Sequence, residues 1–372
     1  MIDVRRLAVM VTLFWVSVTP ADALCRAWPE WAEFRQAYLQ ADGRVIDRSL
    51  PDQPTVSEAA GYAAFLALVG DDRPTFELII RWVRDNLSGG DLNQRLPAWR
   101  WGHRDAGDWG VLDSNSASDA DLWLAFDLVE AGRLWAEPRF ARLGRQLAMR
   151  ILDEEVVHLD DLGPVLLPGR EGFVHDGQRA VVNPSYAPSF VLARLSSIDP
   201  RFGALNQSTD RLLDATVAFG FVPDWAEYVQ GQGYRLVSGQ EGRGAYNAIR
   251  VYLWTALMAD GEARQRAMHR LQAFATQISG DELPEWFDPR TGESGGVASR
   301  AHRAALLPFL KQVAPVRYQR ILRQLHETTA VAHDGGHYYG DVLALIALAY
   351  DEGRYAFASD GRLLRGSSSC RH

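Results

Sequence analysis

The sequence has little of several features that define common classes of protein. It holds two cysteines, and its 39 Lys and Arg residues are outnumbered by 47 Asp and Glu residues in a chain of 372. Because phosphates need cations to neutralise them, this balance gives no reason to expect a nucleic-acid partner. Apolar residues make up 47% of the chain, and this composition excludes a disordered or collagen-like protein.

Long apolar runs are missing beyond residue 23. The run from Leu7 to Val18 follows two arginines and precedes the small-residue triplet Ala-Asp-Ala at 21–23. This pattern predicts a secretory signal peptide over residues 1–23 and a periplasmic or secreted mature chain that does not span the membrane. A membrane anchor is the alternative interpretation. Lipid attachment to Cys25 is disfavoured, because the bulky Leu24 precedes it.

The two cysteines, Cys25 and Cys370, stand at the two ends of the predicted mature chain. In an oxidising compartment a disulfide between them would close a very long loop, with a nominal stabilisation of about 4–5 kcal/mol on the chain-entropy model. Two free thiols at the chain ends are the alternative.

Several functional motifs and any obvious linker are absent as well. The chain has no Gly-x-Ser-x-Gly motif, phosphate loop or dinucleotide fingerprint. His333 and His337 have helix-compatible spacing, but they stand in a glycine-containing segment without a nearby cysteine, so we expect no metal site and no cofactor. No Gly/Ser-rich linker interrupts residues 24–372, which favours a single domain.

Apolar residues recur at helical spacing along the whole mature chain. Ser57 and Ser118 are predicted N-caps, and Pro74 and Pro138 suit first-turn positions. Short β ribbons are expected around 173–182 and 234–238. The spacing predicts twelve helices: Glu30–Ala41, Ser57–Val69, Pro74–Leu87, Asp119–Trp135, Pro138–Glu154, Tyr186–Leu195, Gly203–Val217, Ala245–Met258, Gly261–Thr276, Arg300–Val313, Val316–Thr328 and Tyr338–Glu352. An all-α chain of this kind forms either six helical hairpins closed into a double ring or a two-domain helical array.

Two acidic segments contain candidate catalytic carboxyl groups. Glu58 opens a helix within an apolar stretch, where burial would raise its pKa as a general acid requires. Asp119 and Asp121 open a second helix after a polar turn. One of these two carboxylates could point toward a cleft while the amides of the helix start hold the other. For both segments, simple compensation of the helix dipole is the alternative.

Six segments resemble glycoside hydrolase family 8, and they cover nearly the whole mature chain. They are Leu96–Gly102, Ala117–Asp121, Glu130–Trp135, Asn183–Tyr186, Pro223–Trp225 and Tyr246–Arg250. Within that family, the likeness is to the periplasmic members encoded with bacterial cellulose synthase. The resemblance implies an (α/α)6 toroid and an inverting endo-β-1,4-glucanase that acts on cellulose, with a functional link to the cellulose synthase machinery.

The resemblance also implies roles for single residues. Glu58 would be the general acid, and Asp119 would bind the sugar at the point of cleavage and help to hold it distorted. Tyr186 and Arg250 would lie nearby. Trp99 and Trp101 would be stacking platforms for sugar rings, although a place in the core is the alternative for either tryptophan.

Two positions depart from the family pattern. Asn247 stands where the general base, an Asp, is expected, and a neutral amide cannot take a proton from water. Ala59 and Ala60 follow Glu58 where the family favours glycine next to the acid, so the cleft would differ in shape.

Three explanations of Asn247 compete. Another carboxylate is the base, with Glu241, Asp224 and Asp119 as candidates; or Asn247 orients water and turnover is slow; or the protein binds glucan without cutting it. Lyases and uronyl hydrolases that act on acidic glycans also form double rings of helices, but they would want a basic cleft, for which the arginines are not concentrated enough.

Overall fold

The structure is a computed structural model that describes residues 28–104, 107–159, 162–175, 178–278, 282–327 and 338–366. The predicted signal peptide, both cysteines, His333 and His337 lie outside the described residues, so those predictions stay predictions. None of the helices in the described ranges is long and apolar enough to cross a membrane.

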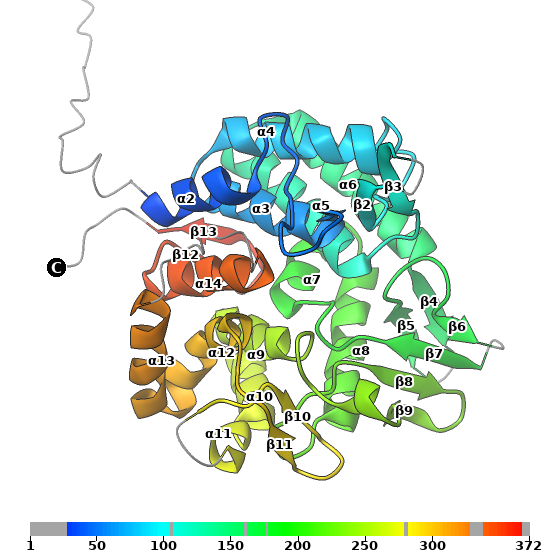
Figure 1. Cartoon of the computed structure of the whole chain (residues 1–372). Helices are drawn as coiled ribbons and strands as arrows, with labels where there is room; N and C mark the ends of the chain where they lie inside the picture. The colour runs from blue at the N-terminus through cyan, green and yellow to red at the C-terminus, as the bar shows by residue number, and fades with distance from the viewer. Residues whose placement is uncertain are drawn as a thin grey trace, which may run out of the picture.

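Twelve helices of the described residues alternate between an inner and an outer ring (Figure 1), which confirms the predicted (α/α)6 toroid. The inner ring is formed by α3 (Ser57–Val69), α5 (Ser118–Leu134), α7 (Ser189–Leu195), α9 (Ile249–Leu257), α12 (Arg300–Val313) and α14 (Tyr338–Asp351). The outer ring is formed by α2 (Pro29–Tyr38), α4 (Arg73–Trp82), α6 (Pro138–Glu154), α8 (Arg201–Thr216), α10 (Glu262–Leu271) and α13 (Pro315–Glu327).

The distribution of apolar residues decides which ring a helix joins. Helix α3 is apolar on every side, and 12 of its 13 residues are buried. Helix α6 buries one stripe that contains Phe140, Leu147 and Ile151, and it exposes the opposite face to solvent. A helix that is apolar all round needs neighbours on all sides, whereas an amphipathic helix covers a core from outside.

Glycines allow the largest of the inner–outer contacts, between α5 and α6. A Cβ atom on Gly132 would lie 2.6 Å from the Cβ atom of Ala141. A Cβ atom on Gly144 would lie 2.8 Å from a methyl carbon of Val129. The two helices therefore pack backbone against backbone at these points.

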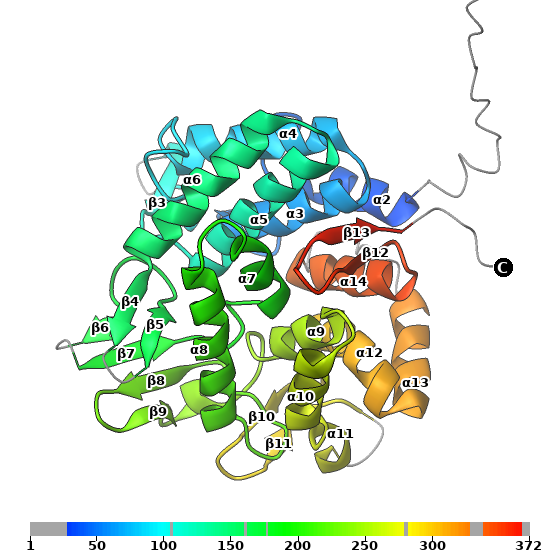
Figure 2. The ribbon, with the colours of Figure 1, turned by 180° about the vertical axis from the view of Figure 1, so that it is seen from behind.

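The ring closes where the first helix meets the last (Figures 1 and 2). The Tyr38 hydroxyl on α2 donates a hydrogen bond of 2.6 Å to Asp341 on α14, and Arg300 of α12 donates to the same carboxylate at 2.9 Å. The guanidinium of Arg354 lies 5.2 Å from the ring of Trp28, and its carbonyl accepts from the amide of Gly366 at 2.7 Å. The two ends of the described chain therefore meet.

The strands in the described ranges are all short, and all pair antiparallel. A three-stranded sheet joins β1 (Thr55–Val56), β2 (Arg100–His103) and β3 (Trp109–Asp113); a four-stranded sheet joins β6 (Val174–His175), β7 (Arg179–Val182), β8 (Ala226–Val229) and β9 (Gly233–Leu236). Three hairpins complete the set: β4 (Val156–Leu159) with β5 (Gly163–Leu166), β10 (Trp286–Phe287) with β11 (Ser294–Gly295), and β12 (Tyr355–Phe357) with β13 (Leu363–Arg365). The predicted ribbons are confirmed as β6–β7 and as β9.

Several predicted helix boundaries are wrong. Ser57 and Ser118 are the first residues of their helices rather than N-caps, and the capping positions are held by Val56 and Ala117, which make no side-chain cap. The predicted helix at 261–276 is divided into α10 and the short α11 (Phe274–Gln277), and a π-helical turn (Val83–Leu87) continues α4. Pro74 and Pro138 do occupy the first turns of α4 and α6.

The inner helices all run in one direction, because an outer helix returns the chain between each pair. Their N-terminal ends therefore gather at one end of the ring. The start of α14 bonds to α3 there, through the Tyr338 hydroxyl and the Ala59 carbonyl at 3.2 Å. Helix N-termini carry positive partial charge, so this end of the ring favours carboxylates.

Candidate active site

Arg250, in the first turn of α9, joins the predicted site residues into one cluster. Its side chain is 4% exposed. One guanidinium nitrogen, Nη1, donates to Asp119 Oδ2 at 2.7 Å and to the Tyr62 hydroxyl at 3.0 Å, while Nη2 donates to Asn247 Oδ1 at 2.7 Å. The guanidinium carbon lies 5.3 Å from the ring of Tyr186. The structure thus brings α3, α5 and α9 together through one cation.

Glu58 lies in the first turn of α3, one turn before Tyr62, and its side chain is half-buried. Its Oε2 atom is buried and has no hydrogen-bond partner within the described ranges. Burial and the negative charge of Asp119 raise the pKa of Glu58 to about 7, and Arg250 partly opposes this rise. The raised pKa expected from the sequence is confirmed, so near neutral pH a substantial fraction of Glu58 is protonated.

Asp119 lies in the first turn of α5 and is 1% exposed. Its Oδ1 atom accepts the amide of Ala120 at 2.9 Å, and Oδ2 binds Arg250. Burial raises the pKa of Asp119, and the arginine opposes this rise. The second acid of the motif, Asp121, is fully buried beside Glu155, so the helix-start amides do not hold it. Neither acid is a solvated group that merely compensates the dipole.

The backbone of Trp99 ties the starts of α3 and α5 together. Its carbonyl accepts the amide of Ser57 at 2.9 Å, and its own amide donates to the carbonyl of Asn115 at 2.8 Å. The Trp99 ring is half-buried. The Trp99 backbone, directly before β2, therefore fixes where Glu58 and the polar turn before Asp119 lie.

Trp101 belongs to an aromatic stack. Its ring is stacked with Trp109 at a centroid distance of 5.4 Å and meets the edge of Trp82 at 5.3 Å. The guanidinium of Arg44 lies 4.4 Å from the Trp101 ring and 4.6 Å from the Trp109 ring. Trp109, which the sequence analysis did not single out, is the member of the stack that is 46% exposed.

Asp224 lies against the segment that leads into α9. Its Oδ1 atom accepts the amides of Ala245, Asn247 and Ala248 at 2.8, 3.0 and 2.7 Å. Burial raises the pKa of Asp224, and these three amides oppose the rise. The neighbouring Trp225 ring lies 6.0 Å from that of Tyr186. This half-buried carboxylate therefore belongs to the cluster around Asn247.

Glu241 does not belong to this cluster. It is exposed on the 3₁₀ turn Gln240–Gly242. Two residues that the sequence analysis missed do belong to the cluster. Tyr62 stands four residues after Glu58 and so shares its helix face, a spacing that could have indicated it. Tyr339, at the start of α14, donates through its hydroxyl to the carbonyl of Tyr246 at 2.6 Å.

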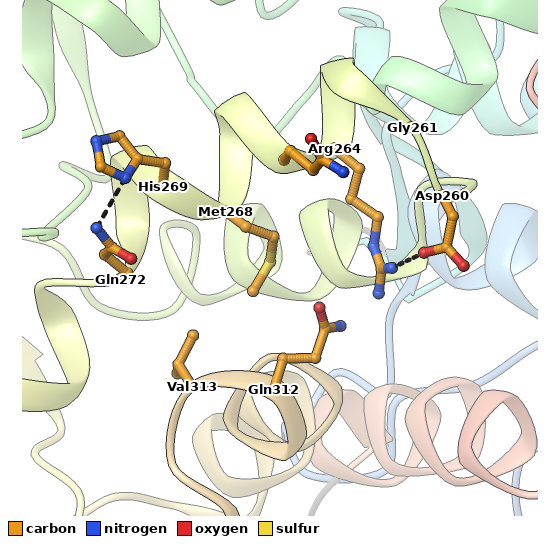
Figure 3. A pocket seen from close by; sticks show the side chains of 9 residues that line it. Asp260, Gly261, Arg264, Met268, His269, Gln272, Gln312 and Val313 are labelled. Carbon is orange, nitrogen blue, oxygen red and sulfur yellow. Dashed lines mark hydrogen bonds and ion pairs between the residues drawn. The ribbon is translucent and has the colours of Figure 1, made fainter.

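A cavity of about 540 Å³ lies between α10 and the C-terminal end of α12 (Figure 3). It is lined by α10 residues, including Arg264, Met268 and His269, and by Gln312 and Val313 at the end of α12. Arg264 binds Asp260 and the carbonyl of Ala256, which is near the end of α9. None of the lining residues is a Trp, Tyr or Phe, so the cavity lacks the large flat rings that stack on sugars. The described ranges contain no group of three residues able to hold a metal ion.

The helices form a double ring that gathers carboxyl groups and aromatic rings at one end. This arrangement is typical of the helical glycoside hydrolases. A family model described as "Glycosyl hydrolases family 8" matches residues 3–353, and the chain belongs to this family.

Similar proteins agree with this membership. The chain is 39% identical to an "Endoglucanase" of Xanthomonas axonopodis pv. citri (strain 306), over 96% of this chain and 94% of the relative. It is also 39% identical to an "Endoglucanase" of Escherichia coli (strain K12), over 95% of each. The solved endo-1,4-D-glucanase of Vibrio fischeri ES114 superposes with a TM-score of 0.84 at 36% identity, covering 91% of this chain and 99% of that one.

Proposed function

We propose that this protein is an endo-β-1,4-glucanase that hydrolyses internal bonds of cellulose with inversion. The observation that carries the proposal is Glu58, whose pKa is raised to about 7 beside the ion pair of Asp119 and Arg250. The names of the relatives, which are similar over nearly the full length of both chains, support the same activity.

Glu58 is the general acid of the proposed reaction. In its neutral form it donates a proton to the glycosidic oxygen as the bond from that oxygen to the sugar breaks, and it is left as a carboxylate. Asp119, held by Arg250, accepts hydrogen bonds from the sugar at the point of cleavage. The half-buried rings of Tyr186 and Trp99 and the exposed ring of Trp109 offer surfaces for neighbouring sugars.

An inverting reaction also needs a carboxylate that takes a proton from the attacking water on the opposite face of the sugar. Asn247 cannot do this, and its Oδ1 atom already accepts from Arg250. Asp119 is engaged by the same arginine, and Glu241 is exposed outside the cluster. The contacts favour Asp224, whose Oδ1 atom is fixed by three amides while Oδ2 makes no hydrogen bond to any described residue.

Incubation with carboxymethylcellulose tests the activity. We expect new reducing ends from the native protein and a loss of about 10²-fold or more in Glu58→Gln, because the amide cannot donate a proton of the required acidity. The same variant should still be retained by cellulose. Retention of the polymer by the native protein without new reducing ends would instead support the alternative function, a glucan-binding accessory protein.

Three variants test the base. Asp224→Asn keeps an oxygen for the three amides, so we expect normal folding and a fall in kcat of about 10²–10⁴-fold. Asn247→Asp should raise hydrolysis above the native level. The double variant should recover at least tenfold over Asp224→Asn, because a carboxylate again faces the water. An unchanged kcat in Asp224→Asn would move the search to Glu241.

The secretion pattern supports a periplasmic or secreted enzyme whose residues 1–23 are removed, leaving one domain over 24–372 with a Cys25–Cys370 disulfide and a functional link to cellulose synthesis. The mass of the exported protein tests both covalent features. We expect a chain that begins at Leu24 and resists alkylation of its thiols until it is reduced.

A further inference from the structure

Two acids that the proposed reaction does not use lie buried at the start of α5. Asp121 on α5 and Glu155, directly after α6, are both 0% exposed. The Ser116 hydroxyl donates to Glu155 Oε1 at 2.6 Å. Both oxygens of Asp121 and the Oε2 atom of Glu155 lack a donor among the described residues, and no described cation pairs with either acid.

The two carboxyl groups lie next to each other, and each shifts the pKa of the other. Two ionised carboxylates can only accept hydrogen bonds, so a bond between them requires a proton. Burial and the charge of Glu155 raise the pKa of Asp121 well above its usual range. Glu155 already accepts from Ser116, whereas neither oxygen of Asp121 accepts from a described residue, so Asp121 is the better placed donor. Burial also raises the pKa of Glu155, whereas Ser116 and Asp121 both stabilise its carboxylate and oppose this rise.

The charged groups around the pair also favour retention of the proton. Asp119 on α5 and Glu58 on α3 both raise the pKa of Asp121. Glu154, at the end of α6, raises the pKa of Glu155. Glu154 is itself paired with arginines, Arg150 on α6 and Arg170 in the loop after β5. Negative charge therefore faces the pair from α3, α5 and α6.

The pair lies at a junction of three segments. The Ser116 hydroxyl, besides donating to Glu155, accepts the amide of Arg170 at 3.0 Å. The carbonyl of Glu155 accepts the amide of Leu167 at 2.8 Å, and the amide of Ser118 donates to the carbonyl of Pro168 at 2.9 Å. The end of α6 and the loop 167–170 are thereby fixed to the start of α5, directly before Asp119.

We propose that Asp121 and Glu155 share one proton and that this hydrogen-bonded pair fixes the start of α5, which holds Asp119 opposite Arg250. Both acids are positioning residues. The catalytic consequence rests on the proposed function, whereas the shared proton does not depend on it.

The pH dependence of folding tests the shared proton. The folded pair keeps a proton that an unfolded chain releases above about pH 4.5, so its contribution is lost as pH rises toward the pKa of the folded pair. Asp121→Asn donates to Glu155 through an amide at any pH. We therefore expect this variant to take up one proton fewer on folding than the native protein. The pH dependence of the free energy of unfolding, measured with denaturant between pH 5 and 9, gives this number for both proteins.

Turnover tests the positioning role. Asp121→Asn should keep kcat within about threefold of the native value, because an amide N–H replaces the carboxyl O–H. Asp121→Ala, which has no donor, should lower kcat at least tenfold with a smaller change in KM. The matched control is Asp127→Ala, which removes another carboxyl that is 0% exposed from α5; it should change kcat by less than threefold.

The outcomes of these two tests are separable. Equal proton uptake in the native protein and Asp121→Asn would overturn the shared proton, even if the enzyme hydrolyses cellulose. An equal loss of kcat in Asp121→Ala and Asp127→Ala would overturn the positioning role. If no variant and no native sample cut cellulose, the proposed function would fail while the folding test still decided the proton.

Discussion

At the scale of single residues, one cation organises the site. Arg250 is buried and donates to a carboxylate, a phenol and an amide from three separate segments. A buried charge with an ionic partner and further hydrogen bonds is tolerated, whereas one left alone is strongly destabilising. Arg250 and Asp119 thus depend on each other, and their ion pair sets the electrostatic environment of Glu58.

Removal of the charge on Asp119 should move the pH limit of activity. That charge raises the pKa of Glu58, so Asp119→Asn should lower the pKa of Glu58, and the acid should lose its proton at a lower pH. We expect the alkaline limb of kcat/KM, measured on the residual activity, to shift to lower pH from its native position near 7. Tyr62→Phe, which removes a bond to Arg250 without a change in charge, is the control and should leave the limb in place.

The sequence predicted a large part of this cluster. Glu58, Asp119, Tyr186, Asn247 and Arg250 were all singled out, and the structure brings them together. The contacts that depend on distant segments could not be predicted. The acid pair joins residues 34 positions apart (121 and 155), and the stack around Trp101 needs Arg44 from a separate segment. Local spacing holds no information about such contacts.

At the scale of elements, periodicity predicted all twelve helices of the two rings but not all of their boundaries. Helix α7 begins at Ser189 rather than Tyr186, because Pro188 precedes it with extended backbone. Helix α9 begins at Ile249 rather than Ala245, because Asp224 takes the amides of the preceding segment. Most of the short strands were missed, since strands of two to five residues show too little alternation.

Two glycine substitutions should have opposite effects on stability. Gly132→Ala places a Cβ atom 2.6 Å from Ala141 between α5 and α6, and overpacking of this kind costs about 1–3 kcal/mol. Gly203→Ala on α8 meets its nearest atom at 3.9 Å, so it should stabilise the protein by up to about 1 kcal/mol through helix propensity. Urea unfolding of the two variants measures both changes. A stable Gly132→Ala would show that the two helices can move apart.

At the scale of the whole molecule, the ring depends on contacts between its first and last helices. Tyr38→Phe removes the hydroxyl that α2 gives to the buried Asp341. Loss of a hydrogen bond to a charged group should lower the free energy of unfolding by about 1.5–3 kcal/mol.

The matched control for ring closure is Tyr318→Phe. Its hydroxyl donates to Asp351 at 2.7 Å, within the consecutive pair of α13 and α14. Asp351 keeps its partner Lys311 in this variant, and the site is only partly buried. We expect a smaller loss in urea unfolding than for Tyr38→Phe. Equal losses in the free energy of unfolding would mean that the contact that closes the ring stabilises the protein no more than a contact between consecutive helices does.

The meeting of Trp28, Arg354 and Gly366 has a consequence for how the chain is ordered along the ring. Every helix pair has a neighbour on each side, so no pair needs the polar outer face that the terminal repeats of an open solenoid require. A circular permutant, with a short linker across this point and new ends in an exposed connection elsewhere, should therefore reach the same toroid. The closed ring therefore does not require the chain to begin at one particular helix pair.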